Sequence, residues 1–260
     1  MIMLRRNLDI KLKTLDEIEI MREAGRISSL ALWEAGRAVR PGISTEELDE
    51  IALNCIKSHG AIPSFLGVDG FPACACISVN EELVHFIPSK DKILKEGDIV
   101  TIDVGAGVGG FHGDNAYTFP CGKISDEATK LLEITKASLQ KGIDAAKISN
   151  RIGDIGNAVQ SFVEAAGFSI IRKFVGHGIG RSVHEAPSVP NFGKKHTGEL
   201  IQEGLVLAIE PMVAVGSPEV EALRDDGWNV VMKDRSLSAH FEHTVAITEK
   251  GVIILTSPDS

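Results

Sequence analysis

The first regular pattern along the chain is an apolar stripe with the three- and four-residue spacing of an α-helix. Thr14 and Glu17 form a capping box immediately before it, and Pro41-Gly42 closes it. The pattern therefore predicts a helix that starts after Thr14 and runs to about Val39. The inward face of this helix is expected to carry Ile18, Met21, Ile27 and Leu30.

A second helix and three strands are predicted next. Ser44 and Glu47 repeat the capping box, and the apolar positions after them predict a helix that ends at Gly60. Segments rich in strand-forming residues then predict strands at about 73–79, 98–105 and 111–119.

The order of elements repeats after Pro120. Helices are predicted at about 126–147 and 152–167, followed by strands near 168–175, 205–213, 229–233 and 240–248. A local match supports a duplication: Asp103 lies six residues after Gly97, and Glu210 lies six residues after Gly204. We expect one α+β domain over residues 1–260, an antiparallel sheet flanked by helices, with pseudo-two-fold repeats at about 14–120 and 121–250.

Composition narrows the classes of partner and location. The formal net charge of −9 favours a peptide or small-molecule partner, because a general nucleic-acid binder needs a basic surface. No segment approaches the roughly 20 apolar residues of a membrane span, and the first residues lack the charge order of a signal peptide. The four cysteines contain no C-x-x-C pair. We therefore expect a cytoplasmic protein with reduced, buried thiols.

A glycine-rich segment at 105–110 matches G-x-G-x-x-G but predicts a hairpin turn. A dinucleotide site needs a helix after this motif, whereas residues 111–120 have a strand pattern. If the turn is centred on Val108-Gly109, Asp103 and Asp114 face each other directly across the hairpin. Two such carboxylates repel by about 4 kcal/mol at 4 Å and a dielectric of about 20, and a cation reverses this. Two solvated aspartates are the alternative.

Three later segments place metal-type ligands beside glycine or proline. They are Val175-Gly176-His177-Gly178-Ile179-Gly180, Ala208-Ile209-Glu210-Pro211 and His240-Phe241-Glu242-His243-Thr244. A lone histidine or an acid before proline is more often structural than functional. The combination of several acids and an imidazole is typical of a site for divalent cations.

These segments carry a resemblance that spans nearly the whole chain. The chain resembles the bacterial type I methionine aminopeptidases of peptidase family M24. The resemblance implies the pita-bread fold, and metal-dependent release of the initiator methionine from nascent proteins and peptides when the next residue is small. The motifs that carry it, in the family's order and spacing, are Ile102-Asp103-Val104, Phe111-His112-Gly113-Asp114, Gly176-His177-Gly178-Ile179-Gly180, Ile209-Glu210-Pro211-Met212 and Phe241-Glu242-His243-Thr244.

The resemblance also implies a role for each site residue. Two divalent cations, drawn from Co, Mn, Fe or Zn, are expected on five ligands, of which Asp114 and Glu242 bridge: Asp103, Asp114, His177, Glu210 and Glu242. Glu210 is also the expected proton acceptor from the attacking water. His184 is expected to donate to the developing oxyanion, and His85 to contact the scissile amide nitrogen.

A pocket for the methionine side chain is implied as well. Its expected wall, for which core packing is the alternative, is Phe65, Phe71, Cys76 and Trp228. The chain departs from the best-known bacterial members at four positions, which affects pocket shape and rate rather than reaction type: Val68, Val84, Phe86 and Val183.

Two other functions compete with this interpretation. One is an Xaa-Pro dipeptidase of the same fold, whose members carry a large N-terminal domain. The other is a non-catalytic pita-bread binding module, against which the complete ligand set argues. Only 31 residues separate Glu210 from Glu242, too few for the insertion of type II enzymes.

The expected partners are the N-termini of nascent polypeptides, with no membrane and no specific nucleic acid, and the expected state is a monomer. Transient ribosome contact is considered at a few basic positions that otherwise form a solvated charged face: Arg5-Arg6, Lys11, Lys13 and Lys194-Lys195.

Overall fold

The computed structural model describes residues 10–223 and 228–257. Its first two helices, α1 (Leu15–Ala38) and α2 (Thr45–Ser58), begin at the predicted capping boxes. The side chain of Thr14 accepts from the backbone N–H of Glu17, and the Glu17 carboxylate accepts from the N–H of Thr14. Both predicted helices are therefore confirmed, and their start points follow from the caps.

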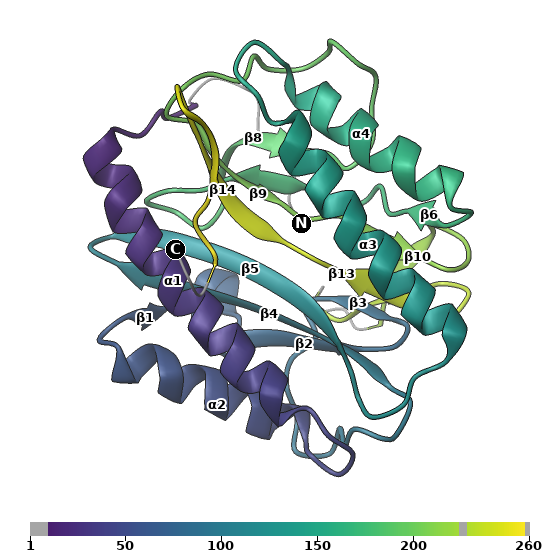
Figure 1. The fold of residues 1–260 in the computed structure, drawn as a ribbon. Coiled ribbons are helices and arrows are strands. Elements are labelled where there is room, and N and C mark those ends of the chain that lie inside the picture. Colours follow the sequence, from purple (N-terminus) through teal and green to yellow (C-terminus); the bar gives the residue numbers. More distant parts are fainter. Residues whose placement is uncertain (1–9, 224–227, 258–260) are drawn as a thin grey trace.

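A long hairpin forms the centre of the first half. β4 (Ile99–Val108) and β5 (Phe111–Pro120) pair along their full length. β1 (Ile62–Pro63) and β2 (Ala75–Val79) pair with the other edge of β4. In Figure 1, α1 and α2 lie beside this sheet, and their apolar faces pack on it as one large buried cluster.

The hairpin turn lies one residue later than the sequence suggested. Gly109 and Gly110 occupy it with φ of +57° and +77°, a conformation that a β-branched residue such as Val108 resists. The register therefore pairs Asp103 with Ala116, and Asp114 with the glycine at 105. The expected direct pairing of the two aspartates is wrong: they lie on one face of the hairpin, offset by two residues.

The second half starts with α3 (Asp126–Ala145) and α4 (Ile152–Ala165), close to the predicted ranges. These helices cover a five-stranded sheet in the order β15-β14-β9-β7-β8. Its strands are β7 (Gly176–Gly178), β8 (Glu185–Val189), β9 (Val206–Ile209), β14 (His243–Thr248) and β15 (Gly251–Ile254). A second large apolar cluster fills the space beneath α3 and α4.

Two strands predicted as continuous are broken in the structure. Glu210-Pro211 separates β9 from β10 (Met212–Ala214), and Phe241-Glu242 separates β13 (Ser238–His240) from β14. β10 and β13 pair with each other and, through β10, with β6 (Ser169–Ile170), so the chain changes sheet at each break. Both candidate acids lie at these breaks, where a side chain is free of the regular sheet.

The smaller elements complete the framework. β3 (Glu82–Val84) pairs with β12 (Val230–Met232), which pairs with β11 (Val220–Ala222), and a short 3-10 helix covers Val68–Gly70. All four cysteines are buried and free, as expected. Among the described residues, no helix is both long and apolar enough for a membrane span.

The two halves share a local hydrogen-bond pattern. Gly97 donates to the carbonyl of Cys121, whose N–H donates to the carbonyl of the residue after Gly97. Gly204 makes the same pair of bonds with Ile247. Each glycine lies two residues before the first residue of the strand that leads to a candidate acid. This correspondence supports the predicted internal repeat.

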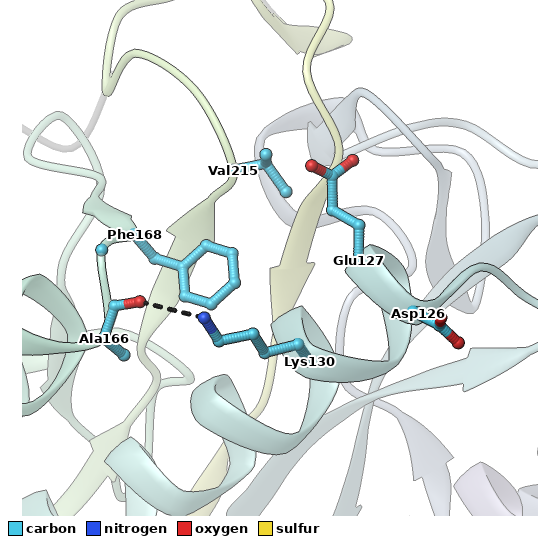
Figure 2. A pocket seen from close by; sticks show the side chains of 7 residues that line it. Asp126, Glu127, Lys130, Ala166, Phe168 and Val215 are labelled. Atoms are coloured by element: carbon cyan, nitrogen blue, oxygen red, sulfur yellow. Dashed lines mark hydrogen bonds between the residues drawn. The ribbon is translucent and has the colours of Figure 1, made fainter.

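A surface hollow lies at the start of α3, lined by Lys130, Phe168 and Val215 among others (Figure 2). Nζ of Lys130 lies 3.5 Å from the carbonyl oxygen of Ala166 and 5.4 Å from the centre of the Phe168 ring. None of the predicted site residues lines this hollow. This hollow is therefore separate from the predicted site.

Candidate metal centre

Four acids and one imidazole converge between the hairpin and the five-stranded sheet. We call this group the acidic cage: Asp103 on β4, Asp114 on β5, His177 on β7, Glu210 after β9 and Glu242 before β14. The backbone joins the two sides directly. Glu242 donates its N–H to the carbonyl of Ala116 at 2.9 Å, and the Thr244 hydroxyl donates to the carbonyl of Asp114 at 2.8 Å.

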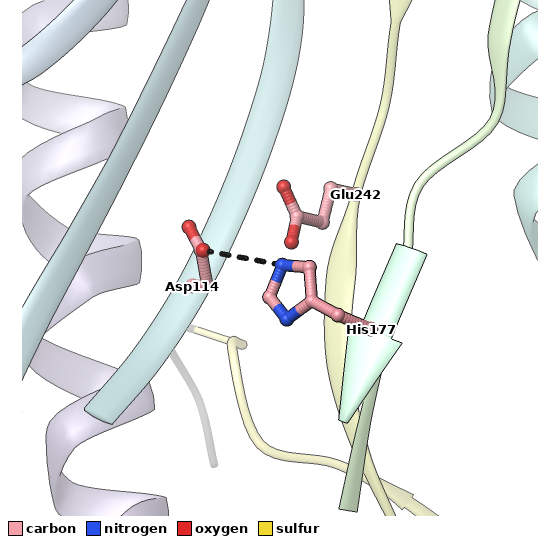
Figure 3. A group of neighbouring side chains, drawn as sticks. All are labelled: Asp114, His177 and Glu242. Carbon is pink, nitrogen blue, oxygen red and sulfur yellow. Dashed lines mark ion pairs between the residues drawn. The ribbon is translucent and has the colours of Figure 1, made fainter. Parts of the chain in front are cut away.

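The ligand atoms lie at distances that suit a shared cation. Nε2 of His177 lies 3.9 Å from Oδ2 of Asp114 and 3.4 Å from Oε1 of Glu210. Asp114, His177 and Glu242 each offer an atom within 4.8 Å of the others, and Figure 3 shows the three side chains converging from separate strands. Atoms that bind one cation at about 2.0–2.2 Å lie about 3 to 4.2 Å apart, the range seen here.

The tautomer of His177 follows from its hydrogen bond. Nδ1 lies 2.9 Å from the carbonyl oxygen of Gly178, so Nδ1 carries the proton and donates it. The lone pair then belongs to Nε2, which faces the carboxylates. This arrangement is typical of a metal-ligating histidine, whose second nitrogen donates to an oxygen acceptor.

The buried carboxyl groups of the cage are unfavourable in their ionised form, and a bound cation would stabilise that form. Burial raises the pKa of Asp103 to about 7, and burial followed by the neighbouring acids raises the pKa of Asp114, Glu210 and Glu242 well above their ordinary values. Three buried oxygens also have no hydrogen-bond partner among the described residues: Asp103 Oδ1, Asp114 Oδ1 and Glu242 Oε1. The donor set of acids and imidazole therefore fits divalent cations.

The two further predicted histidines lie beside the cage. The His184 ring lies 4.5 Å from the His177 ring at an interplanar angle of 75°. The His85 ring packs edge-on against Phe174 and Trp228, with centroids 5.6 and 6.1 Å away. Burial, with a smaller contribution from His184, lowers the pKa of His85 to about 4, so this imidazole is neutral at pH 7.

The four residues predicted for the methionine pocket form one apolar cluster. Phe71 and Cys76 are buried in it, and the partly buried Phe65 and Trp228 pack against them. Trp228 lies edge-on to Phe71 with ring centroids 5.2 Å apart. Cys76 pairs with Asp103 in the β2–β4 ladder, so the cluster adjoins the acidic cage. The predicted pocket residues therefore lie beside the candidate metal ligands.

The four departures from the family pattern divide into two kinds. Val84 and Val183 are buried, and Val84 belongs to an apolar cluster that includes Met212 and Met232. Val68 and Phe86 are half-buried. The buried pair therefore has the tighter packing constraint.

One histidine of the site lies in a segment named from the sequence but has no role among the predicted ligands. His240 is buried, and its Nε2 lies 3.7 Å from Oε2 of Glu210 and 3.8 Å from Oε2 of Glu242. Burial lowers the pKa of His240 to about 3. His240 opens the segment of metal-type residues that ends at Thr244, but the sequence pattern does not show that its ring and the Glu242 side chain face the same cage.

Comparison with known proteins places this geometry in a family. Residues 19–249 match the model of Metallopeptidase family M24. Methionine aminopeptidase 1 of Bacillus subtilis (strain 168) is 52% identical over 244 residues, which cover 94% of this chain and 98% of that protein. Methionine aminopeptidase of Clostridium perfringens is 55% identical over 247 residues, which cover 95% and 98%.

Solved structures agree with the fold. The crystal structure of methionine aminopeptidase from Thermotoga maritima matches with a TM-score of 0.93 and 42% identity, covering 96% of this chain and 100% of that one. Prolidase from Pyrococcus furiosus matches with a TM-score of 0.78 and 24% identity, covering 95% of this chain and 65% of that one. The second likeness concerns the fold alone. Together they confirm the predicted pita-bread architecture.

Proposed function

The chain belongs to metallopeptidase family M24, and we propose that its acidic cage holds two divalent cations and releases N-terminal methionine from peptides. The activity is that of a methionine aminopeptidase, a metal-dependent hydrolase. The observation that carries the proposal is the convergence of four ligand-type side chains from both halves at cation-sharing distances, namely Asp114, His177, Glu210 and Glu242.

The cage residues differ in whether they would contact one cation or both. Asp114 and Glu242 would each contact both cations, as the resemblance implies, and Asp103, His177 and Glu210 would complete the set. Glu242 belongs to two overlapping groups of ligand atoms, which supports a bridging role. When bound, such cations polarise a peptide carbonyl and lower the pKa of water. Four carboxylates and two divalent ions balance in charge, and Co, Mn, Fe and Zn all suit this donor set.

Three side chains of the chain itself handle protons and the substrate. Glu210 accepts the proton of the attacking water, a role that its buried position and raised pKa support. His184, in ring contact with His177, donates to the oxygen of the scissile carbonyl as negative charge develops. His85, neutral beside Trp228, contacts the amide nitrogen of the bond that breaks.

The apolar cluster next to Asp103 receives the methionine side chain. Phe65, Phe71, Cys76 and Trp228 supply its wall. A thioether packs favourably against aromatic rings, so two or more such rings suit methionine over a polar side chain. The following residue of the substrate must be small, as the resemblance implies.

Dipeptide turnover tests the assignment against the Xaa-Pro alternative. The protein, treated with chelator and then supplied with Mn²⁺ or Co²⁺, is expected to cleave Met-Gly-Met and to leave Met-Pro and Gly-Pro intact. Cleavage of the proline dipeptides without Met-Gly-Met would contradict the proposal. Metal titration addresses the non-catalytic alternative, which predicts no binding in the micromolar range.

We place the protein in the cytoplasm as a monomer that acts on nascent N-termini. Fewer of the basic positions are available for ribosome contact than the sequence alone suggested. Lys13 is buried and pairs with Glu185 at 2.8 Å, which removes it from any RNA-facing surface. Lys11 and Lys194-Lys195 are exposed, and Arg5-Arg6 lie outside the described residues.

A further inference from the structure

His240 is a buried histidine with no hydrogen bond at either ring nitrogen. Its exposed fraction is 2%, and neither Nδ1 nor Nε2 has a hydrogen-bond partner among the described residues. A neutral imidazole carries one donor and one acceptor, and burying both without partners is unfavourable. An unsatisfied ring in the interior therefore indicates a partner of another kind.

The backbone holds the ring in place at the edge of the acidic cage. His240 lies at the end of β13, opposite Met212 of β10. Its N–H donates to the Thr118 hydroxyl at 3.0 Å, and its carbonyl accepts from the same hydroxyl at 2.9 Å. These contacts fix the backbone of His240 at the end of β13, from which its ring reaches Glu210 and Glu242.

The surroundings of Nε2 of His240 resemble those of Nε2 of His177. The distances from Nε2 of His240 to carboxylate oxygens are 3.7 and 3.8 Å, and those from Nε2 of His177 are 3.4 and 3.9 Å. All four are long for hydrogen bonds but suit atoms that share a cation. Glu210 lies between the two imidazoles, with Oε1 toward His177 and Oε2 toward His240.

We infer that His240 is a sixth protein ligand of the metal centre and binds, through Nε2, the cation that it shares with Glu210 and Glu242. This inference rests on the proposed two-metal function of the same cage. It gives the centre two imidazole donors instead of the one that the resemblance implies. A second nitrogen donor shifts the preference of the site from Mn toward Fe, Co or Zn.

Cobalt titration of a matched pair of variants tests the inference. His240→Gln keeps a side chain of similar length but replaces the imidazole. His243→Gln is the control, because His243 lies three residues away and hydrogen-bonds to the Thr256 hydroxyl at 2.9 Å. Chelator-treated wild type and variants are titrated with Co²⁺ by calorimetry and by visible absorption, and thermal melting verifies that each is folded.

The expected result is specific to one of the two ions. His240→Gln is expected to weaken one Co²⁺ affinity by at least about 10-fold and to change the visible bands, because losing even an indirect partner of a ligand costs about 10- to 100-fold. His243→Gln is expected to stay within about twofold of wild type. Equal affinities and spectra for His240→Gln and wild type would overturn the inference while leaving the two-metal function intact.

Two further outcomes separate ligation from hydrogen bonding. If His240→Gln matches wild type and His240→Leu does not, His240 acts as a donor to the carboxylates and the inference fails. If wild type itself binds no Co²⁺ in the micromolar range, the proposed function fails with it. Should His240→Gln not fold, pulsed electron resonance of the Mn²⁺-loaded wild type decides, since two bound histidine nitrogens support the inference and one refutes it.

Discussion

His85 and His196 share the same left-handed backbone conformation, with φ of +60° and +62°, but only His85 lies beside the acidic cage. The His196 side chain is exposed. The pair therefore offers a comparison in which the backbone conformation is held constant and the chemical surroundings differ. Asparagine tolerates positive φ better than most residues, so it is the suitable replacement at both positions.

We predict that His85→Asn lowers kcat for Met-Ala-Ser by about 100- to 1000-fold, the usual cost of losing a group that stabilises the reacting atoms. Metal affinity is expected to remain within about twofold, because His85 is not among the ligands. Steady-state kinetics with parallel Co²⁺ titration measures both. His196→Asn should behave as wild type, and an equal loss in both variants would point to backbone strain instead.

Trp228 is predicted to determine selectivity for methionine. Trp228→Ala removes one wall of the apolar cluster, and the lost burial of the substrate side chain lowers kcat/KM for Met-Ala-Ser by about 10- to 100-fold. Trp33→Ala serves as the control, since Trp33 packs on Tyr117 and Phe119 away from this cluster. The control should lower the melting temperature yet leave the ratio of kcat/KM between Met-Ala-Ser and Leu-Ala-Ser unchanged.

Asp114→Asn tests the bridging role. Replacing one carboxylate oxygen by an amide removes a charge from the most buried part of the cage, where Asp114 is 3% exposed. We expect turnover of Met-Ala-Ser to fall at least about 100-fold with every divalent metal tried, and the stoichiometry of Co²⁺ to drop below two. Asp144→Asn on the exposed face of α3 is the matched control. Undiminished turnover by Asp114→Asn would exclude a bridging function.

The sequence predicted the helices well because their signals are local. Thr14 with Glu17 and Ser44 with Glu47 satisfy the helix N-termini through neighbours three residues away, so no tertiary information is needed. The hairpin register depends on which two of the residues Val108, Gly109 and Gly110 occupy the centre of the turn with positive φ. Choosing Val108-Gly109 over Gly109-Gly110 shifted every cross-strand pair, including that of Asp103.

The sequence motifs identified most of the site residues but did not predict how these residues come together in space. Glu210 and Glu242 project at points where strands change sheet, and periodicity alone read those segments as continuous strands. Their convergence with His177 depends on long-range pairing of β7, β9 and β14. His240 was not assigned as a ligand for the same reason, since its relation to Glu210 exists only after β10 and β13 pair.

The pH dependence of stability offers a test that needs no substrate. Raised carboxyl pKa values mean that, without metal, Asp114, Glu210 and Glu242 hold protons in the folded state that the unfolded chain releases near pH 4. Where the unfolded state binds fewer protons, stability falls as pH rises. Asp103, with a pKa of about 7, adds to this fall until it ionises.

Between pH 7 and 8 the carboxyls are the main groups that differ between the two states. The cage histidines have lowered pKa values and are neutral when folded, and unfolded histidines are largely neutral above about pH 6.5. Below that pH the histidines act in the opposite sense, because only the unfolded chain takes up their protons, and they offset part of the carboxyl effect.

We predict that, with chelator present, the free energy of unfolding falls between pH 7 and 8 by up to about 1.4 kcal/mol per pH unit for each carboxyl that stays protonated. Saturating Mn²⁺ or Co²⁺ should abolish this fall, because the ionised carboxylates are then the stabilised form. Urea unfolding at closely spaced pH values measures both slopes. Glu242→Gln should flatten the slope of the metal-free protein, since it removes one titrating group, and parallel slopes with and without metal would show that the cage does not bind the ions.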